Sequence, residues 1–399
     1  MTDATTTPAS TSASGPATTP VPAAEDRRSP LHDEHVALGA TLTSFAGWQM
    51  PLRYTSDLAE HTAVRSAAGL FDLSHMAEIV VTGPDAGAFL DRALVGHASA
   101  IRLLGAKYTM ICAPDGGVID DLVVYHLEPE RYLVVANASN HDPVLAALTE
   151  RAAGLDVAVD DESATTALVA VQGPRALEIV LAAGIDLADD VVTALKYYAC
   201  LPFTFAGRPA LLARTGYTGE DGFEFYVAAD DAPVLWRRLL EVGTPLGLVP
   251  AGLSARDSLR LEAGMPLYGN ELDRTTTPHD AGLGRVVALG KTGPDGAPVP
   301  FVGREALEAR AAAEPTRVLV GLEGLGRRAA RHGYPVLAGP GQVVGTVTSG
   351  APSPTLGHPI AMAYVHPSVA TEGTQLDVDV RGRPEPVRVV ALPFYRRPR

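Results

Sequence analysis

The residues with the clearest chemical potential lie between positions 214 and 224, where an arginine is followed by three glycines and three carboxylates. Glycine adopts backbone angles that other residues resist and lets a ligand approach the main chain. The following residues, 223–227, alternate and are rich in β-formers, which predicts a strand. Glu224 would then be held stiffly and could accept two N–H donors from one edge of a ligand. A polar hairpin turn is the alternative interpretation.

A second acidic motif places Asp120 and Asp121 after a Gly-Gly turn, at the start of another predicted strand. Neighbouring residues of a strand point to opposite faces, so one aspartate should face inward and the other outward. An inward carboxylate in an apolar strand needs a partner, and a functional role is one way to supply it. The alternative is a solvated loop end, and the residues alone do not decide which aspartate is the functional one.

A basic motif lies in residues 252–269, where a helical pattern carries Arg256 and Arg260 one turn apart. Two arginines on one helical face could bind an anion together. Ordinary surface ion pairs with the neighbouring carboxylates are the alternative.

The elements that must position these residues contain a diverged repeat. The pattern Val-x-Gly-Pro-x-Ala occurs at 81–86 and at 171–176, and x-Pro-Val-Leu occurs at 142–145 and at 232–235. Each copy follows a strand-like run and opens a helical pattern. Two matches with the same offset of 90 residues predict two related α+β domains.

The chain changes character after residue 287. A loop rich in Gly and Pro and a short helical pattern precede several short, β-branched runs, which predict a mostly β domain of barrel or jelly-roll type. The first 29 residues are rich in Thr, Ala, Ser and Pro and predict a disordered tail. The expected organisation is therefore a tail at 1–29, α+β domains at 31–160 and 161–287, a linker with a short helix at 288–314, and a β domain at 315–399.

Composition excludes several classes of function. The net charge of −14 argues against nucleic-acid binding, and no apolar run is long enough to span a membrane. Two cysteines cannot form a structural zinc site alone and suggest no disulfide framework, which fits a reducing cytoplasm. No dinucleotide or phosphate-binding loop has the required spacing. We therefore expect no metal and no flavin.

Six sequence blocks, taken in order, resemble one family, the aminomethyltransferases (T-proteins) of the glycine cleavage system. They are FAGWQMP at 45–51, GLFDLSHM at 69–76, GGVIDD at 116–121, the stretch at 214–224, the segment at 255–270, and GTVTSGAPSP at 345–354. Six blocks in order are far more specific than one motif. The resemblance implies an α+β cloverleaf of three domains with tetrahydrofolate in a central cavity.

The resemblance also implies a reaction and its residues. The one-carbon unit would pass from the aminomethylated lipoyl group of H-protein to tetrahydrofolate, giving 5,10-methylenetetrahydrofolate, ammonia and the reduced lipoyl group. Asp121 matches the catalytic carboxylate, Glu224 the one that binds the pterin, and Arg256 a ligand-binding arginine. The positions that match the lining of the folate cavity are Tyr108, Tyr125, Asn137, Tyr197 and Tyr217.

Two other members of the same superfamily are alternatives. A folate-dependent demethylase shares the fold but commonly alters the acidic position that Asp121 occupies here. A folate-binding protein without transferase activity would carry a Lys-Gly-Cys-Tyr type of signature, which this sequence lacks.

Overall fold

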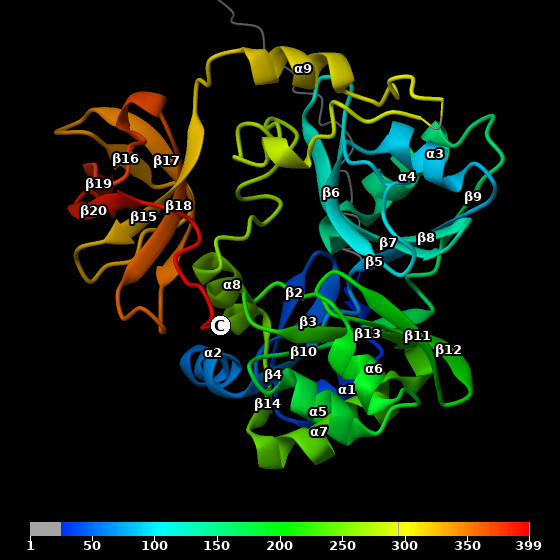
Figure 1. The fold of residues 1–399 in the computed structure, drawn as a ribbon. Coiled ribbons are helices and arrows are strands. Elements are labelled where there is room, and N and C mark those ends of the chain that lie inside the picture. Colours follow the sequence, from blue (N-terminus) through cyan, green and yellow to red (C-terminus); the bar gives the residue numbers. More distant parts are fainter. Residues whose placement is uncertain (1–24, 294, 399) are drawn as a thin grey trace, which may run out of the picture.

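The computed structural model describes residues 25–293 and 295–398 (Figure 1). It contains two open sheets, a small N-terminal sheet and a closed barrel. The mixed α and β architecture with a C-terminal barrel confirms the predicted fold class. Within the described residues, no helix is both long and apolar enough to cross a membrane.

The first large sheet is built from one continuous stretch of chain. Its strands, in spatial order, are β6 (Ala106–Cys112), β7 (Val118–Glu128), β8 (Arg131–Ala136), β5 (Ala77–Thr82) and β9 (Ala158–Asp161). Helices α3 (Ala86–Ala93) and α4 (His141–Arg151) cover one face, where Phe89, Leu90 and Leu148 pack into the core.

The second large sheet repeats the order of the first four strands and ends in two other strands where the first sheet has β9. It runs β11 (Cys200–Phe205), β12 (Arg208–Ala213), β13 (Gly222–Ala228), β10 (Thr166–Gln172), β4 (Ala68–Asp72) and β14 (Leu248–Pro250). Helices α5 (Ala176–Ala183), α6 (Asp189–Ala194) and α7 (Ala232–Gly243) enclose a core that contains the fully buried Trp236. The shared order of the first four strands confirms that the two α+β units are related.

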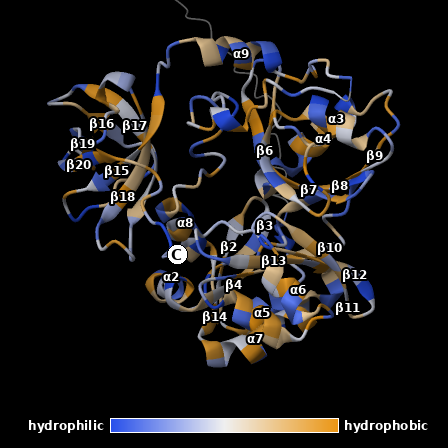
Figure 2. Ribbon diagram, viewed as in Figure 1, coloured by the Kyte–Doolittle hydropathy of each residue, from blue (hydrophilic) through white to orange (hydrophobic). Residues whose placement is uncertain are grey.

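The faces of the two sheets that their helices leave open share one apolar layer. Tyr125, Leu133 and Val135 contribute from the first sheet, and Leu168 and Tyr226 contribute from the second. Figure 2 shows the apolar colouring along the strands of both sheets. Side chains of β13 that face this layer therefore meet side chains of β7.

The N-terminal segment packs on the second unit. Helix α1 (His32–Ala37) is followed by β2 (Thr41–Phe45) and β3 (Trp48–Arg53), and helix α2 (Asp57–Ser66) leads into β4. Although β4 lies within the predicted first domain, 31–160, it pairs with β10 and β14 of the second sheet. We therefore propose domain limits in which residues 31–72 belong to the second unit.

The predicted tail, 1–29, needs a correction at its end. Residues 1–24 lie outside the described part of the chain, but Arg27–Arg28 form β1, which pairs with β3. Ser29 is only 4% exposed, and its hydroxyl donates a hydrogen bond to Asp72. Residues 27–29 are therefore part of the fold, because a backbone pairing and a buried carboxylate hold them.

The C-terminal part is a closed barrel of six strands, which follow helix α9 (Arg304–Ala312). Its order is β15 (Val318–Gly324), β18 (Pro359–Val365), β17 (Val343–Pro352), β16 (Pro335–Leu337), β19 (Gln375–Asp379) and β20 (Pro384–Val390). Helix α8 (Leu253–Glu262) lies between the barrel and the second unit, and contacts α2 as well as β17 and β18 (Figure 1).

Candidate active site

The two aspartates of β7 have different surroundings. Asp120 is fully buried, and its carboxylate accepts hydrogen bonds from the backbone N–H of Asn137 (2.8 Å), from Asn137 Nδ2 (2.8 Å) and from Asn140 Nδ2 (2.6 Å). Asp121 is half-buried, and accepts from the Tyr108 hydroxyl at 2.9 Å and from Asn137 Nδ2 at 3.0 Å. Asp120 is thus committed to the protein, and Asp121 is the carboxylate that can also meet a ligand.

Burial makes both carboxylates hard to ionise. It raises the pKa of Asp121 to about 6, against hydrogen bonds from Tyr108 and Asn137 that lower it. Burial and the charge of Asp121 raise the pKa of Asp120 to about 7. Two like charges on adjacent residues disfavour each other's ionisation. A pKa of about 6 still leaves Asp121 mostly ionised near neutral pH.

Glu224 lies on β13 with one oxygen held by the protein. Oε2 accepts a hydrogen bond from the Thr215 hydroxyl and lies 3.5 Å from the Tyr125 hydroxyl. Among the described residues, Oε1 has no hydrogen-bond partner, so this oxygen can accept from a ligand. Burial raises the pKa of Glu224, and the Thr215 hydrogen bond and the charge of Arg256 act against that rise.

The glycines of the 214–224 stretch serve packing. A Cβ atom on Gly216 would lie 2.0 Å from the Gln172 side chain, and one on Gly222 would lie 2.1 Å from it. Gln172 Nε2 donates to the Thr215 carbonyl, and the Thr218 hydroxyl donates to Gln172 Oε1. Close approach of Gln172, rather than of a ligand, is therefore what the structure shows at these two glycines.

The two arginines of α8 have different partners. Arg260 is buried in ion pairs with Glu271 and Asp257, so it is not available to an external anion as the sequence suggested. The Arg256 side chain makes no hydrogen bond or ion pair within the described chain, and its guanidinium lies 4.7 Å from the centre of the Tyr217 ring. Arg256 is therefore the cation that α8 can offer to a ligand.

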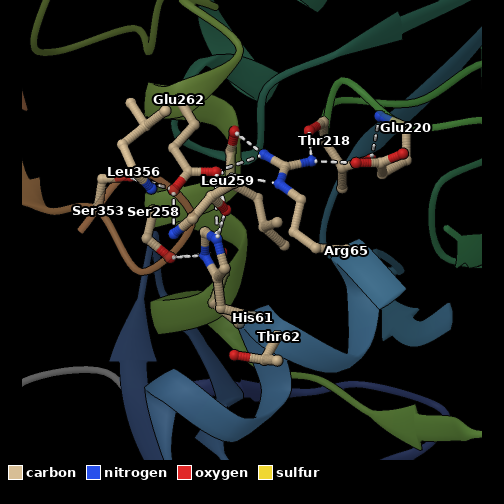
Figure 3. A network of polar contacts seen from close by, with 12 residues as sticks. His61, Thr62, Arg65, Thr218, Glu220, Ser258, Leu259, Glu262, Ser353 and Leu356 are labelled. Atoms are coloured by element: carbon tan, nitrogen blue, oxygen red, sulfur yellow. Dashed lines mark hydrogen bonds and ion pairs between the residues drawn. The ribbon is translucent and has the colours of Figure 1, made fainter. Parts of the chain in front are cut away.

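A buried ionic network joins the elements around the site (Figure 3). Arg65 of α2 donates to the Thr218 carbonyl, to Glu220 at 2.8 Å and to Glu262 at 2.8 Å. Glu262 also accepts from Ser353 and Thr355 of the barrel unit, and His61 lies beside it. Arg65 thus ties the loop that leads to Glu224 to α8 and to the barrel.

The remaining predicted site residues differ in what they contact. Tyr108 and Asn137 contact Asp121, and Tyr217 lies on Arg256 and donates to the Pro266 carbonyl. Tyr125 is fully buried beside Glu224, so it supports that carboxylate instead of offering a ring face to a cavity. Tyr197 is 47% exposed and stacks edge-on against Tyr198.

Three residues near the site were not predicted from the sequence, although Thr215 lies within the 214–224 stretch. Asn140 and Thr215 act through single hydrogen bonds to a carboxylate. Tyr198 has a left-handed backbone, with φ of 58°, and the charges of Glu224 and Asp121 add to the rise of its pKa that burial causes. A left-handed tyrosine is unusual and marks a position that the surrounding fold must enforce.

No cluster of three or more His, Cys, Asp or Glu side chains suited to a metal occurs in the part of the chain that the structure describes.

Two related α+β units followed by a closed C-terminal barrel form the architecture of the T-protein class, and comparison with known families supports this assignment. The GCVT N-terminal domain family matches residues 31–291, and the glycine cleavage T-protein C-terminal barrel family matches residues 317–396. The chain therefore belongs to the glycine cleavage T-protein family, and it is an enzyme of the aminomethyltransferase class.

Individual relatives agree with this assignment. The aminomethyltransferase of Streptomyces avermitilis is 60% identical over 93% of this chain and 98% of its own length, and that of Moorella thermoacetica is 48% identical over 94% and 100%. The crystal structure of glycine cleavage system aminomethyltransferase T from Bartonella henselae superposes with a TM-score of 0.84, at 35% identity, over 92% of this chain and 98% of that one.

Proposed function

We propose that this enzyme moves the carbon of an aminomethyl group from a lipoyl sulfur to tetrahydrofolate, with lipoylated H-protein as the transient carrier. The carbon loses its bonds to sulfur and to the amine and gains bonds to two folate nitrogens. The two protons of those nitrogens leave on the thiol and on ammonia. The products are 5,10-methylenetetrahydrofolate, ammonia and dihydrolipoyl H-protein.

Asp121 is the proposed catalytic residue. When the carbon separates from sulfur or from ammonia it acquires iminium-like positive charge, which a fixed anion stabilises. Tyr108 and Asn137 both donate to Asp121, so its position is set before the ligand arrives. Preorganisation of this kind means that little reorganisation is needed during the reaction. This geometry is the observation that carries the proposal.

Glu224 and Arg256 are the proposed residues for binding tetrahydrofolate. Glu224 Oε1 suits the paired N–H donors of a pterin edge, and the Arg256 guanidinium suits an anionic group of the ligand, since neither has a hydrogen-bond or ion-pair partner among the described residues. Tyr217 and Tyr197 supply aromatic surface beside them. Tyr108 and Asn137 border the same site from β6 and from the end of β8.

The proposal places the enzyme in the cytoplasm, with no nucleic acid or membrane as a partner and no metal or flavin as a cofactor. Both cysteines, Cys112 and Cys200, are free and buried, which fits a reducing compartment. The net charge of −14 disfavours binding to nucleic acid.

The test is single-turnover release of ammonia from an aminomethylated lipoyl H-protein, with and without tetrahydrofolate. We expect rapid release only when tetrahydrofolate is present. Reaction with dimethylglycine at the same rate would instead indicate a demethylase. Folate binding without any transfer from the carrier would indicate a binding protein.

A further inference from the structure

A chain of three hydroxyl groups leads through the layer between the two sheets to Glu224. The Tyr226 hydroxyl donates to the Tyr125 hydroxyl at 3.2 Å, and the Tyr125 hydroxyl lies 3.0 Å from the Thr215 hydroxyl. The Thr215 hydroxyl in turn donates to Glu224 Oε2. The chain crosses from one sheet to the other, because Tyr125 belongs to β7 and Tyr226 to β13.

The direction of donation in this chain follows from its proton count. Each hydroxyl has one proton to donate. Thr215 gives its proton to the carboxylate, so its oxygen is free to accept from Tyr125, and Tyr125 can accept from Tyr226. All three hydroxyls therefore point their donors toward Glu224. In a chain of this kind each hydrogen bond polarises the next, so the donor that reaches the carboxylate is strengthened.

The chain lies in surroundings where polar groups are costly. Thr215, Tyr125 and Tyr226 are all buried, and the two tyrosines belong to the apolar layer that also contains Leu133 and Leu168. A carboxylate beside such a layer is unfavourable unless donors satisfy it. Phenylalanine and valine would fill the same space without hydroxyls, so packing alone does not explain the three donors.

We propose that Thr215, Tyr125 and Tyr226 are positioning residues for the substrate: they keep Glu224 ionised and fix Oε2, so that Oε1 is presented to the N–H edge of the pterin. The inference rests on the proposed folate-binding role of Glu224. None of the three side chains needs to touch the ligand, because each acts through the carboxylate.

The charged and titratable groups around Glu224 agree with its role as an ionised acceptor. The positive charge of Arg256 of α8, like the Thr215 hydrogen bond, opposes the rise of the Glu224 pKa that burial causes. Four tyrosines lie near it, and burial raises their own pKa values, so they stay neutral: Tyr125, Tyr226, Tyr197 and Tyr198. Glu78 lies near Tyr226, and burial raises the pKa of its carboxyl well above the usual value, which disfavours a negative charge there.

The affinity for tetrahydrofolate should depend on pH through Glu224. Glu224 accepts from the ligand as an anion, so affinity for tetrahydrofolate is lost as the pH falls through the pKa of Glu224. The Thr215 hydrogen bond lowers that pKa. Removing the hydroxyl raises it, and the loss of affinity then begins at a higher pH.

The experiment measures the dissociation constant of tetrahydrofolate over a pH series for the intact enzyme, four hydroxyl variants and Glu224→Gln. Thr215→Val removes the hydroxyl with little change of shape, Thr215→Ser keeps it, and Tyr226→Phe removes the far end of the chain. Thr348→Val is the matched control, since the Thr348 hydroxyl is also buried but donates to the Met362 carbonyl inside the barrel.

We expect Thr215→Val to weaken binding about tenfold near neutral pH, the usual size for a lost hydrogen bond to a charged group. Its affinity should also begin to fall at a higher pH than that of the intact enzyme. Tyr226→Phe should shift the profile in the same direction by less. Thr215→Ser and Thr348→Val should follow the intact enzyme, and kcat at saturating tetrahydrofolate should change much less than KM in Thr215→Val.

Two results would overturn the inference in distinguishable ways. If Thr215→Val binds more weakly but keeps the pH profile of the intact enzyme, the hydroxyls only stabilise the fold. If Glu224→Gln binds tetrahydrofolate as tightly as the intact enzyme at every pH, Glu224 itself is not the pterin acceptor, and the binding proposal fails together with this one.

Discussion

The two large sheets have the same strand order in four positions, yet they support the site with different strands. The first sheet carries Asp121 on β7, its second strand, and the second sheet carries Glu224 on β13, its third. In the first sheet Tyr125 pairs with Leu133, and at the equivalent pair in the second sheet Ala213 faces Glu224. The position of Glu224 is thus apolar in the first sheet. The repeat supplied the scaffold, and the acidic residues arose at non-equivalent positions of it.

The two carboxylates also differ in what holds them. Asp121 is held by an amide and a phenol, and sits beside a second aspartate whose charge opposes its own. Glu224 is held by a hydroxyl and has a cation, Arg256, nearby. The first arrangement suits a charge used in the reaction, and the second suits a charge used to bind. The predictions below test this division.

The largest effect is expected for Asp121→Asn. A preorganised charge at the reacting centre is typically worth about a hundredfold or more in rate. The variant should therefore lose most of its transfer rate while its dissociation constant for tetrahydrofolate changes little, as single-turnover assays and binding titrations would show. Asp120→Asn is the comparison: if it is inactive while Asp121→Asn turns over normally, the wrong aspartate has been assigned.

A second prediction concerns Arg65, which joins the loop before Glu224 to α8 and the barrel. Arg65→Met leaves Glu220 and Glu262 without their buried partner, which should cost about 3 kcal/mol of unfolding free energy. The damage should fall on the Glu224 side, so tetrahydrofolate affinity should drop more than the rate at saturation. Denaturant unfolding and steady-state kinetics check both parts. Glu178→Gln, which breaks an exposed pair with Arg175, is the control and should change little.

The third prediction is the pH dependence of the chemical step. Because burial raises the pKa of Asp121 to about 6, its charge is present above that pH, and the rate should fall as the pH drops through it. The Tyr108 hydrogen bond lowers this pKa, so Tyr108→Phe should move the acid limb of kcat to higher pH. A limb that does not move in Tyr108→Phe would show that another group controls it.

The repeat, the barrel and the family could be predicted from the sequence, because each leaves a signal within a short window. Gly-Pro turns at matching offsets revealed two units, and β-branched runs between turn residues revealed the barrel. The residues that hold the site carboxylates in place leave no such signal in a short window of sequence. Asn140 donates to a carboxylate 20 residues away and Thr215 to one 9 residues away. Arg65 donates to two carboxylates, 155 and 197 residues away. Only the packed sheets create these contacts. The pairing of β4 with β10 and β14 left no local signal for the same reason, since pairing partners are set by tertiary packing.

The smallest expected effect is on the melting temperature, because the second sheet depends on the N-terminal segment and the first does not. The second sheet contains Asp72 of β4, which accepts from His35 at 2.8 Å and from Ser29, whereas every strand of the first sheet lies between residues 77 and 161. Deleting residues 1–24 should leave the melting temperature unchanged. Deleting 1–29 removes β1 and the Ser29 donor, and should lower it by about 3 °C, the usual size for one lost hydrogen bond to a charged group.

The pH dependence of this loss identifies its cause. Burial raises the pKa of Asp72, but the His35 and Ser29 hydrogen bonds outweigh burial and hold the pKa below its usual value. A carboxyl with a lowered pKa stabilises the folded state above the pKa of the unfolded chain, and this stabilisation is lost as the pH falls through the folded value. In the variant that lacks only residues 1–24, Ser29→Ala should therefore reproduce part of the fall in melting temperature near neutral pH and less of it in acid. A loss that is equal at every pH would assign the effect to the β1 pairing instead of to Asp72.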